Sequence, residues 1–255
     1  MIDETMARAL QGKTAIITGA SSGLGRASAL AFAHAGADVA LLARSKADLQ
    51  EVAAEVERLG RRALVLPTDL SSETAILNAV EQVTDIFGRT DVLLNNAGTD
   101  VPGAVTDLSA NDWDLVLNIN LRAPFLLTKA VFPVMQVQGG GTIINVSSVA
   151  GKRGWANAAA YCASKFGMTG FTQALHAEGK EHGIRAMVVY PGAMATNWGE
   201  WTPEARKEDK KENHSSSDAL SPEAAASFLV WLASAPQGMV LTETVVMPLK
   251  EQGWP

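Results

Sequence analysis

The 255-residue chain is 47% hydrophobic and 19% charged, which allows a substantial buried core and favours one α/β domain over residues 1–255. Its net charge of −6, without a basic cluster, argues against a nucleic-acid partner. The single cysteine excludes an internal disulfide, and there is neither an apolar signal segment in the first residues nor an apolar run of ~20 residues, so we expect a cytoplasmic protein without a membrane span.

The N-terminal region predicts a dinucleotide site. Residues 14–17 are apolar and mostly β-branched, which indicates a buried strand, and a periodic apolar stretch from Leu24 to Ala35 predicts a helix. A turn with Gly-x-x-x-Gly-x-Gly spacing joins them. Its glycines let a pyrophosphate approach backbone N–H groups at the positive end of the helix. The candidate phosphate contacts of this turn are Gly19, Ser21, Ser22, Gly23, Leu24 and Gly25.

The second predicted strand, residues 38–43, bears on the choice of cofactor. An NAD-binding chain would end this strand with an acidic residue that binds the ribose 2′-hydroxyl. Here Ala43 takes that place and Arg44 follows. Because a guanidinium pairs with a 2′-phosphate and a carboxylate would repel one, we expect NADP(H) rather than NAD(H). The alternative is that Arg44 is a solvated loop charge.

Apolar runs alternate with helical patterns along the rest of the chain. Such alternation predicts βαβ units, and therefore a doubly wound, Rossmann-type, seven-stranded, mostly parallel sheet with helices on both faces. Active sites of such folds lie at the carboxyl ends of the strands. Five further strands complete the predicted set, at residues 63–66, 91–95, 142–146, 186–190 and 244–247.

A tyrosine and a lysine four residues apart, Tyr161 and Lys165, predict acid–base chemistry. Residues at this spacing share one face of a helix. An ammonium beside a phenol favours the phenolate, so we expect a lowered phenol pKa and a proton donor usable near neutral pH. Ser148, at the end of the fifth strand, stands at a spacing that suits the same site.

These motifs resemble the short-chain dehydrogenase/reductase family, in its short, single-domain branch, over nearly the whole chain. The resemblance implies adenine contacts after the third strand, cofactor contacts after the fourth, and nicotinamide carboxamide contacts after the sixth. The residues so implied, beside Tyr161 and Lys165, are Asp69, Leu70, Asn96, Ala97, Gly98, Pro191, Gly192, Met194 and Thr196.

The resemblance also implies a catalytic set of Asn120, Ser148, Tyr161 and Lys165. Tyr161 would give the carbonyl oxygen a proton as hydride arrives, or remove it in the oxidative direction. Lys165 would hold the nicotinamide ribose, and Ser148 would orient the substrate oxygen. Asn120 would hold a helix kink and a water, and Pro124 nearby supports a local irregularity.

Residues 193–220 are rich in charges and follow the expected nicotinamide contact. The resemblance implies a substrate lid here, with Trp198 and Trp201 facing the pocket; the alternative is a solvated loop. The C-terminus lacks the glycine pair near an aspartate found in many relatives, which weakens a close identification with the fatty-acid-synthesis ketoreductases and leaves the packing of Trp254 open.

We therefore expect an enzyme that transfers hydride between NADP(H) and a small carbonyl compound or secondary alcohol, assembled as a homodimer or homotetramer. Candidate pocket residues flank the catalytic segments: Thr99, Gly154, Trp155, Asn157, Met194 and Trp198. The rival enzyme is an NAD-dependent alcohol dehydrogenase. A rival from another class is a nicotinamide-sensing regulator, which would typically lack the tyrosine or the lysine. The four histidines show no metal-ligand spacing, so we assign no metal site.

Overall fold

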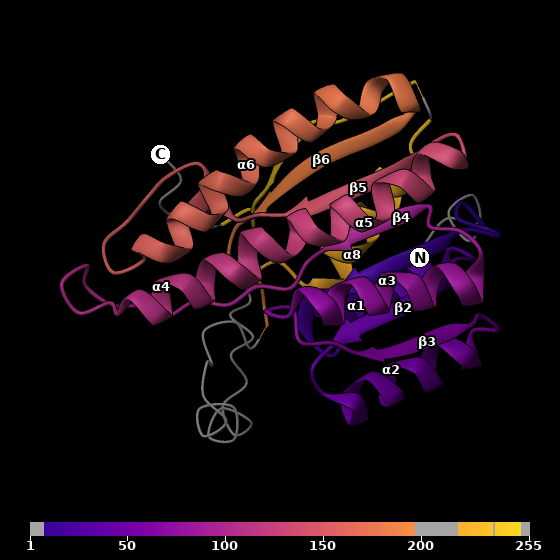
Figure 1. Ribbon diagram of the computed structural model, residues 1–255, viewed down its shortest axis with the longest axis horizontal. Coiled ribbons are helices and arrows are strands. Elements are labelled where there is room, and N and C mark those ends of the chain that lie inside the picture. Colours follow the sequence, from indigo (N-terminus) through magenta and orange to yellow (C-terminus); the bar gives the residue numbers. More distant parts are fainter. Residues whose placement is uncertain (1–7, 197–218, 237, 251–255) are drawn as a thin grey trace.

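The computed structural model describes residues 8–196, 219–236 and 238–250, and its strands form one seven-stranded sheet (Figure 1). The strand order is β3-β2-β1-β4-β5-β6-β7, and every pairing is parallel, which confirms the predicted Rossmann-type sheet. The strands are β1 Thr14–Thr18, β2 Asp38–Ala43, β3 Ala63–Pro67, β4 Val92–Asn95, β5 Gly141–Val146, β6 Ile184–Pro191 and β7 Glu243–Val246.

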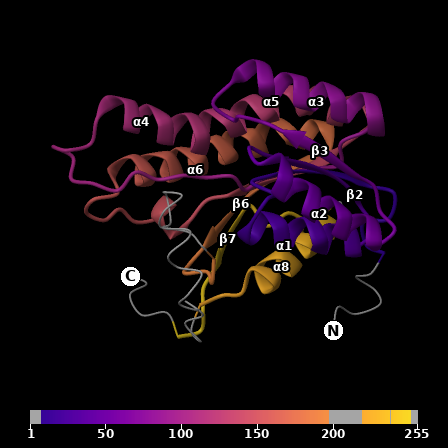
Figure 2. The ribbon, with the colours of Figure 1, turned by 90° about the horizontal axis from the view of Figure 1, so that it is seen from below.

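Helices cover both faces of the sheet, as Figure 2 shows in the view from below. One face carries α1 Gly23–His34, α2 Lys46–Arg58 and α8 Pro222–Ser234. The other carries α3 Glu73–Phe87, α5 Ala123–Val137 and α6 Ala159–Gly179, with α4 Ala110–Leu117 leading into α5. Three short turns complete the described elements: the π-helical η1 Asn118–Arg122 and the 3₁₀-helical η2 Val149–Gly151 and η3 Lys180–His182.

The sheet separates two hydrophobic cores. Neighbouring residues of one strand point to opposite faces, so Ile16 packs under α3 and α5 while Ile17 packs under α1 and α8. Leu93 and Leu94 divide in the same way. Because both faces are covered, the strands are apolar at successive positions rather than at alternate ones. Because of these continuous apolar runs, the strands could be predicted from the sequence.

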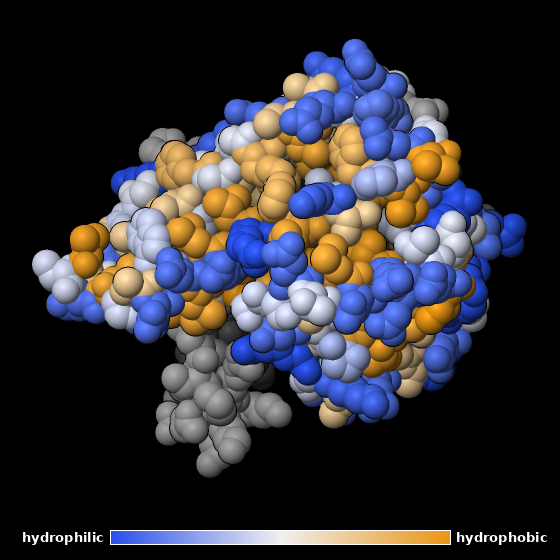
Figure 3. Space-filling model, in the orientation of Figure 1, coloured by the Kyte–Doolittle hydropathy of each residue, from blue (hydrophilic) through white to orange (hydrophobic). Residues whose placement is uncertain are grey.

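Within the described residues, the unbroken helical run Ala110–Val137 is, by length and composition alone, apolar enough to cross a membrane. In the structure it packs against α3 and α6, and its own residues Leu127, Val131 and Met135 point into the core. A single helix of this kind is weak evidence for a membrane span, because helices that line a protein core pass the same test. Figure 3 views this face and shows apolar side chains gathered over α4, α5 and α6, among polar ones.

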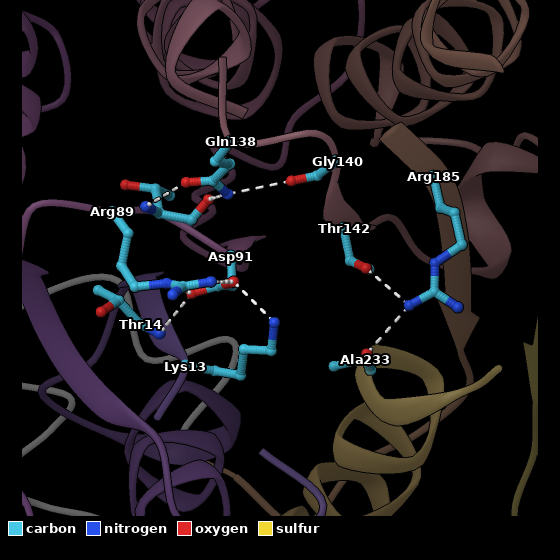
Figure 4. A network of polar contacts seen from close by, with 10 residues as sticks. Lys13, Thr14, Arg89, Asp91, Gln138, Gly140, Thr142, Arg185 and Ala233 are labelled. Carbon is cyan, nitrogen blue, oxygen red and sulfur yellow. Dashed lines mark hydrogen bonds and ion pairs between the residues drawn. The ribbon is translucent and has the colours of Figure 1, made fainter. Parts of the chain in front are cut away.

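Polar contacts tie the sheet together at the amino ends of its strands (Figure 4). The Asp91 carboxylate, just before β4, accepts from Lys13 at 3.1 Å and from Arg89 at 2.6 Å. Arg185 on β6 donates to the Thr142 hydroxyl at 2.8 Å and to backbone carbonyls at the end of α8. Ligands of doubly wound sheets bind at the opposite edge, where the strands have their carboxyl ends.

Candidate active site

The glycine turn after β1 has a geometry that requires its glycines. Gly19 and Gly23 have φ of 67° and 51°, in the left-handed region. A Cβ on Gly25 would lie 2.0 Å from the Gly19 carbonyl oxygen, so only hydrogen fits there. Ser22 starts α1 in an extended conformation without a side-chain cap, so the first N–H groups of the helix keep their capacity for an anion. The turn therefore fits a dinucleotide pyrophosphate.

A hydroxyl joins this turn to the end of β4. The Thr18 Oγ1 atom accepts from the backbone N–H groups of Asn96 at 2.9 Å and Ala97 at 3.0 Å, and the Asn96 amide donates to the Thr18 carbonyl at 2.9 Å. A Cβ on Gly23 would lie 3.4 Å from Thr196 Cγ2. The predicted residues Asn96, Ala97 and Thr196 thus surround the glycine turn at the point where strand order reverses, with Gly98 directly following.

Arg44 and Asp69 come together where β2 and β3 end side by side. Arg44 is exposed, directly after β2. Hydrogen bonds from the Ser71 N–H and hydroxyl, aided by the positive charge of Arg44, hold the pKa of Asp69 below its usual value. The Asp69 carboxyl is therefore ionised at neutral pH. The Leu70 side chain is buried in the core, so only its backbone can contact a cofactor.

The segment after β6 begins the predicted lid. Gly192 N–H donates to the Val246 carbonyl at 2.9 Å, directly after Pro191 ends the strand. Met194 then forms a bridge with Leu220, so the two ends of the 193–220 segment pair with each other. Trp198 and Trp201, predicted to face the pocket, lie outside the described residues, as does Trp254.

Tyr161 and Lys165 lie on α6, both nearly inaccessible to solvent. The half-buried Ser148 donates a hydrogen bond to the Tyr161 phenol and caps η2, accepting from the Ala150 N–H at 3.2 Å. The Lys165 Nζ atom lies 5.5 Å from the centre of the Tyr161 ring and donates to the Val146 carbonyl at 3.0 Å. The structure thus brings the three predicted residues together at the carboxyl end of β5.

The pKa values of this site correct one expectation. Burial raises the pKa of Tyr161, and the negative charge of Asp100 adds to the rise, while the hydrogen bond from Ser148 opposes it. Burial lowers the pKa of Lys165 to about 8. The expectation of a lowered phenol pKa is therefore wrong, because burial outweighs the hydrogen bond from Ser148. A phenol that stays protonated at neutral pH suits the role of proton donor.

Asn120 lies fully buried in η1, which confirms the predicted irregularity in this helix as a π-helical turn. Its side chain accepts from the Thr99 N–H and donates to the Thr99 carbonyl, both at 2.8 Å. It also donates to the Ser164 hydroxyl at 3.0 Å, which in turn donates to the Tyr161 carbonyl at 2.7 Å. Asn120 therefore fixes both the loop after β4 and the helix that carries Tyr161.

Sequence reasoning missed two residues of this site. Ser164 stands within the run that was read for Tyr161 and Lys165, and its link to Asn120 depends on packing between distant helices. Asp100 is a carboxylate next to an expected cofactor segment, a signal that could have been weighed. Among the described residues, no group of three or more histidine, cysteine, aspartate or glutamate side chains could hold a metal ion.

Known proteins share this architecture. A family model described as short chain dehydrogenase matches residues 13–207. The chain is 35% identical over 236 residues to the 3-oxoacyl-acyl-carrier-protein reductase FabG of Thermotoga maritima, covering 92% of this chain and 96% of that one. It is 32% identical over 247 residues to the NADP-dependent 3-hydroxy acid dehydrogenase of Schizosaccharomyces pombe, covering 96% and 95%. A solved metagenomic short-chain oxidoreductase in complex with NADP has a TM-score of 0.81 at 34% identity, covering 94% of this chain and 99% of that one.

Proposed function

The chain belongs to the short-chain dehydrogenase/reductase family, whose members are oxidoreductases that act on CH–OH or carbonyl groups with NAD(P). On this premise we propose that the protein transfers hydride between NADP(H) and a carbonyl or secondary alcohol substrate, with Tyr161 as general acid and base. The observation that carries the proposal is the contact of Ser148 with a buried, protonated Tyr161 beside Lys165.

Each residue of the site has a separate task in this proposal. NADPH, when bound, supplies the hydride. Tyr161 donates its phenolic proton to the substrate oxygen in reduction and takes it back in oxidation. Ser148 donates a hydrogen bond to the same oxygen and so orients the carbonyl. Lys165 holds the nicotinamide ribose, and its positive charge stabilises the phenolate left after proton transfer.

Tyr161→Phe tests the proton donor. We expect turnover of any carbonyl substrate to fall by at least ~10³-fold, at the upper part of the range for general acid catalysis, while NADPH binding stays within about threefold. Tyr190→Phe is the matched control, since it removes the hydroxyl of a buried tyrosine outside the site and should keep most of the activity. An active Tyr161→Phe enzyme would refute the assignment, and a wild-type protein that binds NADPH without turning over carbonyls would favour a sensor.

The preference for NADP(H) is proposed from Arg44. The end of β2 carries this exposed arginine and no acidic residue, and the S. pombe relative is named as NADP-dependent. We expect NADPH to bind at least tenfold more tightly than NADH, a difference of about 1.4 kcal/mol, in a titration followed by nicotinamide fluorescence. Arg44→Ala should remove this difference, whereas Arg58→Ala, at the far end of α2, should retain it. Equal binding of NADH by the wild type would favour NAD-dependent alcohol oxidation.

We also propose that residues 1–255 form one oxidoreductase domain with a lid at 193–220, and that copies associate through α4, α5 and α6. A surface hollow on this face is lined by Leu117, Leu121, Phe125 and Phe171 among polar residues. Phe125 and Phe171 meet edge to face, with ring centres 6.2 Å apart, and Phe125 is 46% exposed. An apolar surface of this kind is typical of a protein–protein contact, which supports a homodimer or homotetramer.

A further inference from the structure

The loop that follows β4 is held at two points beside the active site. At its start, the Thr99 backbone makes two hydrogen bonds with the Asn120 side chain, each 2.8 Å long. Further on, the Gly103 N–H donates to the Asn157 carbonyl at 2.9 Å, and Gly103 forms a bridge with Ala158. Asn120 binds the helix of Tyr161 through Ser164, and Ala158 directly precedes that helix, so the residues between Thr99 and Gly103 lie fixed against the catalytic helix.

Asp100 stands in the middle of this fixed loop. Its side chain is half-buried, and its carboxylate accepts one hydrogen bond from the Val101 N–H at 2.8 Å. No lysine, arginine or histidine of the described residues forms an ion pair with it. The hydrogen bonds of Thr99 and Gly103 place Asp100 on a loop fixed against the start of α6, the helix that carries Tyr161. Burial raises the pKa of the Asp100 carboxyl, and its negative charge contributes to the raised pKa of Tyr161.

Within the part of the chain that the structure describes, this half-buried carboxylate has no counter-charge, and such a group is costly unless a ligand compensates it. The single bond to Val101 does not explain the charge, because an asparagine oxygen would accept from the same N–H group. What distinguishes aspartate from asparagine at this position is the negative charge itself, carried by a loop that is fixed against the helix of Tyr161.

We propose that Asp100 determines substrate specificity: its carboxylate selects ketones and alcohols that carry an ammonium or hydroxyl group next to the reacting carbon, and disfavours those that carry a carboxylate there. This inference rests on the proposed function and names the substrate class of the same site. An opposite charge or a hydrogen-bond donor on the substrate satisfies Asp100 on binding, whereas an anionic substrate places two negative charges together in a poorly solvated space.

A matched series of methyl ketones tests the proposal. Aminoacetone, hydroxyacetone, butanone and acetoacetate share the CH3–CO–CH2– unit and differ in the terminal group. With NADPH, we expect wild-type kcat/KM to be highest for aminoacetone and lowest for acetoacetate. In Asp100→Asn, the value for aminoacetone should fall at least tenfold and that for acetoacetate should rise at least tenfold, while butanone stays within twofold.

Asp107→Asn is the matched control, because Asp107 is an exposed aspartate seven residues further along that lacks the contact with the site. It should leave the aminoacetone-to-acetoacetate ratio within twofold of the wild type. An unchanged ratio in Asp100→Asn would overturn the proposal even though the enzyme turns over all four ketones.

If the proposed enzymatic function were wrong, the wild type would reduce none of the four ketones. The role of Asp100 would then be tested by the binding of the ketones rather than by their turnover. Calorimetry of the wild type and Asp100→Asn with aminoacetone and with acetoacetate, in the presence of NADP+, should then show the same reversal in affinity. Equal affinities of the two proteins for both compounds would overturn the role of Asp100 independently of turnover.

Discussion

Lys165 is 3% exposed, and burial lowers the pKa of its ammonium to about 8, against ~10.4 in an unfolded chain. Between these two values the unfolded state binds more protons than the folded state, so the free energy of unfolding rises with pH. We expect wild type to gain about 3 kcal/mol relative to Lys165→Met between pH 8 and pH 10.4, measured by urea unfolding at a series of pH values.

Tyr161 acts in the opposite direction at higher pH. Its pKa is raised by burial, so the folded state keeps a proton that the unfolded state loses above pH ~10, and stability falls there. The lysine variant retains this tyrosine, so the comparison of the two proteins isolates Lys165. Parallel stability curves for the two proteins from pH 8 to pH 10 would show that the lysine is not desolvated.

At the scale of residues, the sequence predicted which residues form the site better than it predicted the surroundings that set their pKa values. Tyr161, Lys165 and Ser148 were recognisable from their types and spacing, and the structure places them together. The direction of the Tyr161 pKa could not be read from a local pattern, because it depends on how deeply α6 is buried. Asp100 follows an expected cofactor segment, but its position against α6 could not be predicted, because it arises from contacts between segments distant in the chain.

At the scale of elements, two helical glycines provide a matched pair. Gly25→Ala would place a Cβ 2.0 Å from the Gly19 carbonyl oxygen and 2.7 Å from the Asn96 amide, so the phosphate turn must shift. We expect NADPH affinity to fall by more than tenfold and the free energy of unfolding to drop by about 1–3 kcal/mol, as for other overpacking changes.

Gly170→Ala is the counterpart on α6, exposed and with no atom within 4 Å of the added Cβ. It should stabilise the protein by about 0.5–1 kcal/mol and leave cofactor binding unchanged, because alanine favours the helix. Thermal unfolding and fluorescence titration measure both effects. If the two variants behaved alike, helix propensity rather than steric contact at the turn would govern the result at Gly25.

The elements themselves were largely predictable, since each strand is an apolar run between turn residues. The predicted strand boundaries lie within two residues of the observed ones: β2 matches at both ends, while β6 begins at Ile184 and ends at Pro191 rather than spanning 186–190. The π-helical turn η1 was predicted only as an irregularity near Pro124. Its true form depends on Asn120, whose partners Thr99 and Ser164 come from other parts of the chain.

At the scale of the whole molecule, assembly can be tested on the α4–α6 face. Phe125→Glu puts a charge in the apolar hollow, and we expect it to shift the protein from an oligomer to a monomer in sedimentation velocity. Val137→Glu, at the exposed end of α5, is the control and should leave the oligomer intact. A wild-type protein that sediments as a monomer would refute the proposed assembly.

Local patterns alone did not supply the strand order. Alternating strands and helices predict a parallel sheet, but the reversal that puts β1 next to β4 is set by packing across the whole chain. The clustering of Asn96 and Thr196 around the glycine turn follows from that order. The positions of such residues became predictable only through resemblance to a known family.

The core beneath α1 has a consequence for biosynthesis. That core is completed by α8, which packs closely on α1 although it begins only at Pro222. At the usual ~5–20 residues per second, roughly 10–40 s pass between translation of α1 and translation of α8. During this interval the nascent chain exposes apolar side chains such as Phe32 at the ribosome, so chaperones that bind nascent apolar segments should engage the N-terminal half and release it once α8 has emerged.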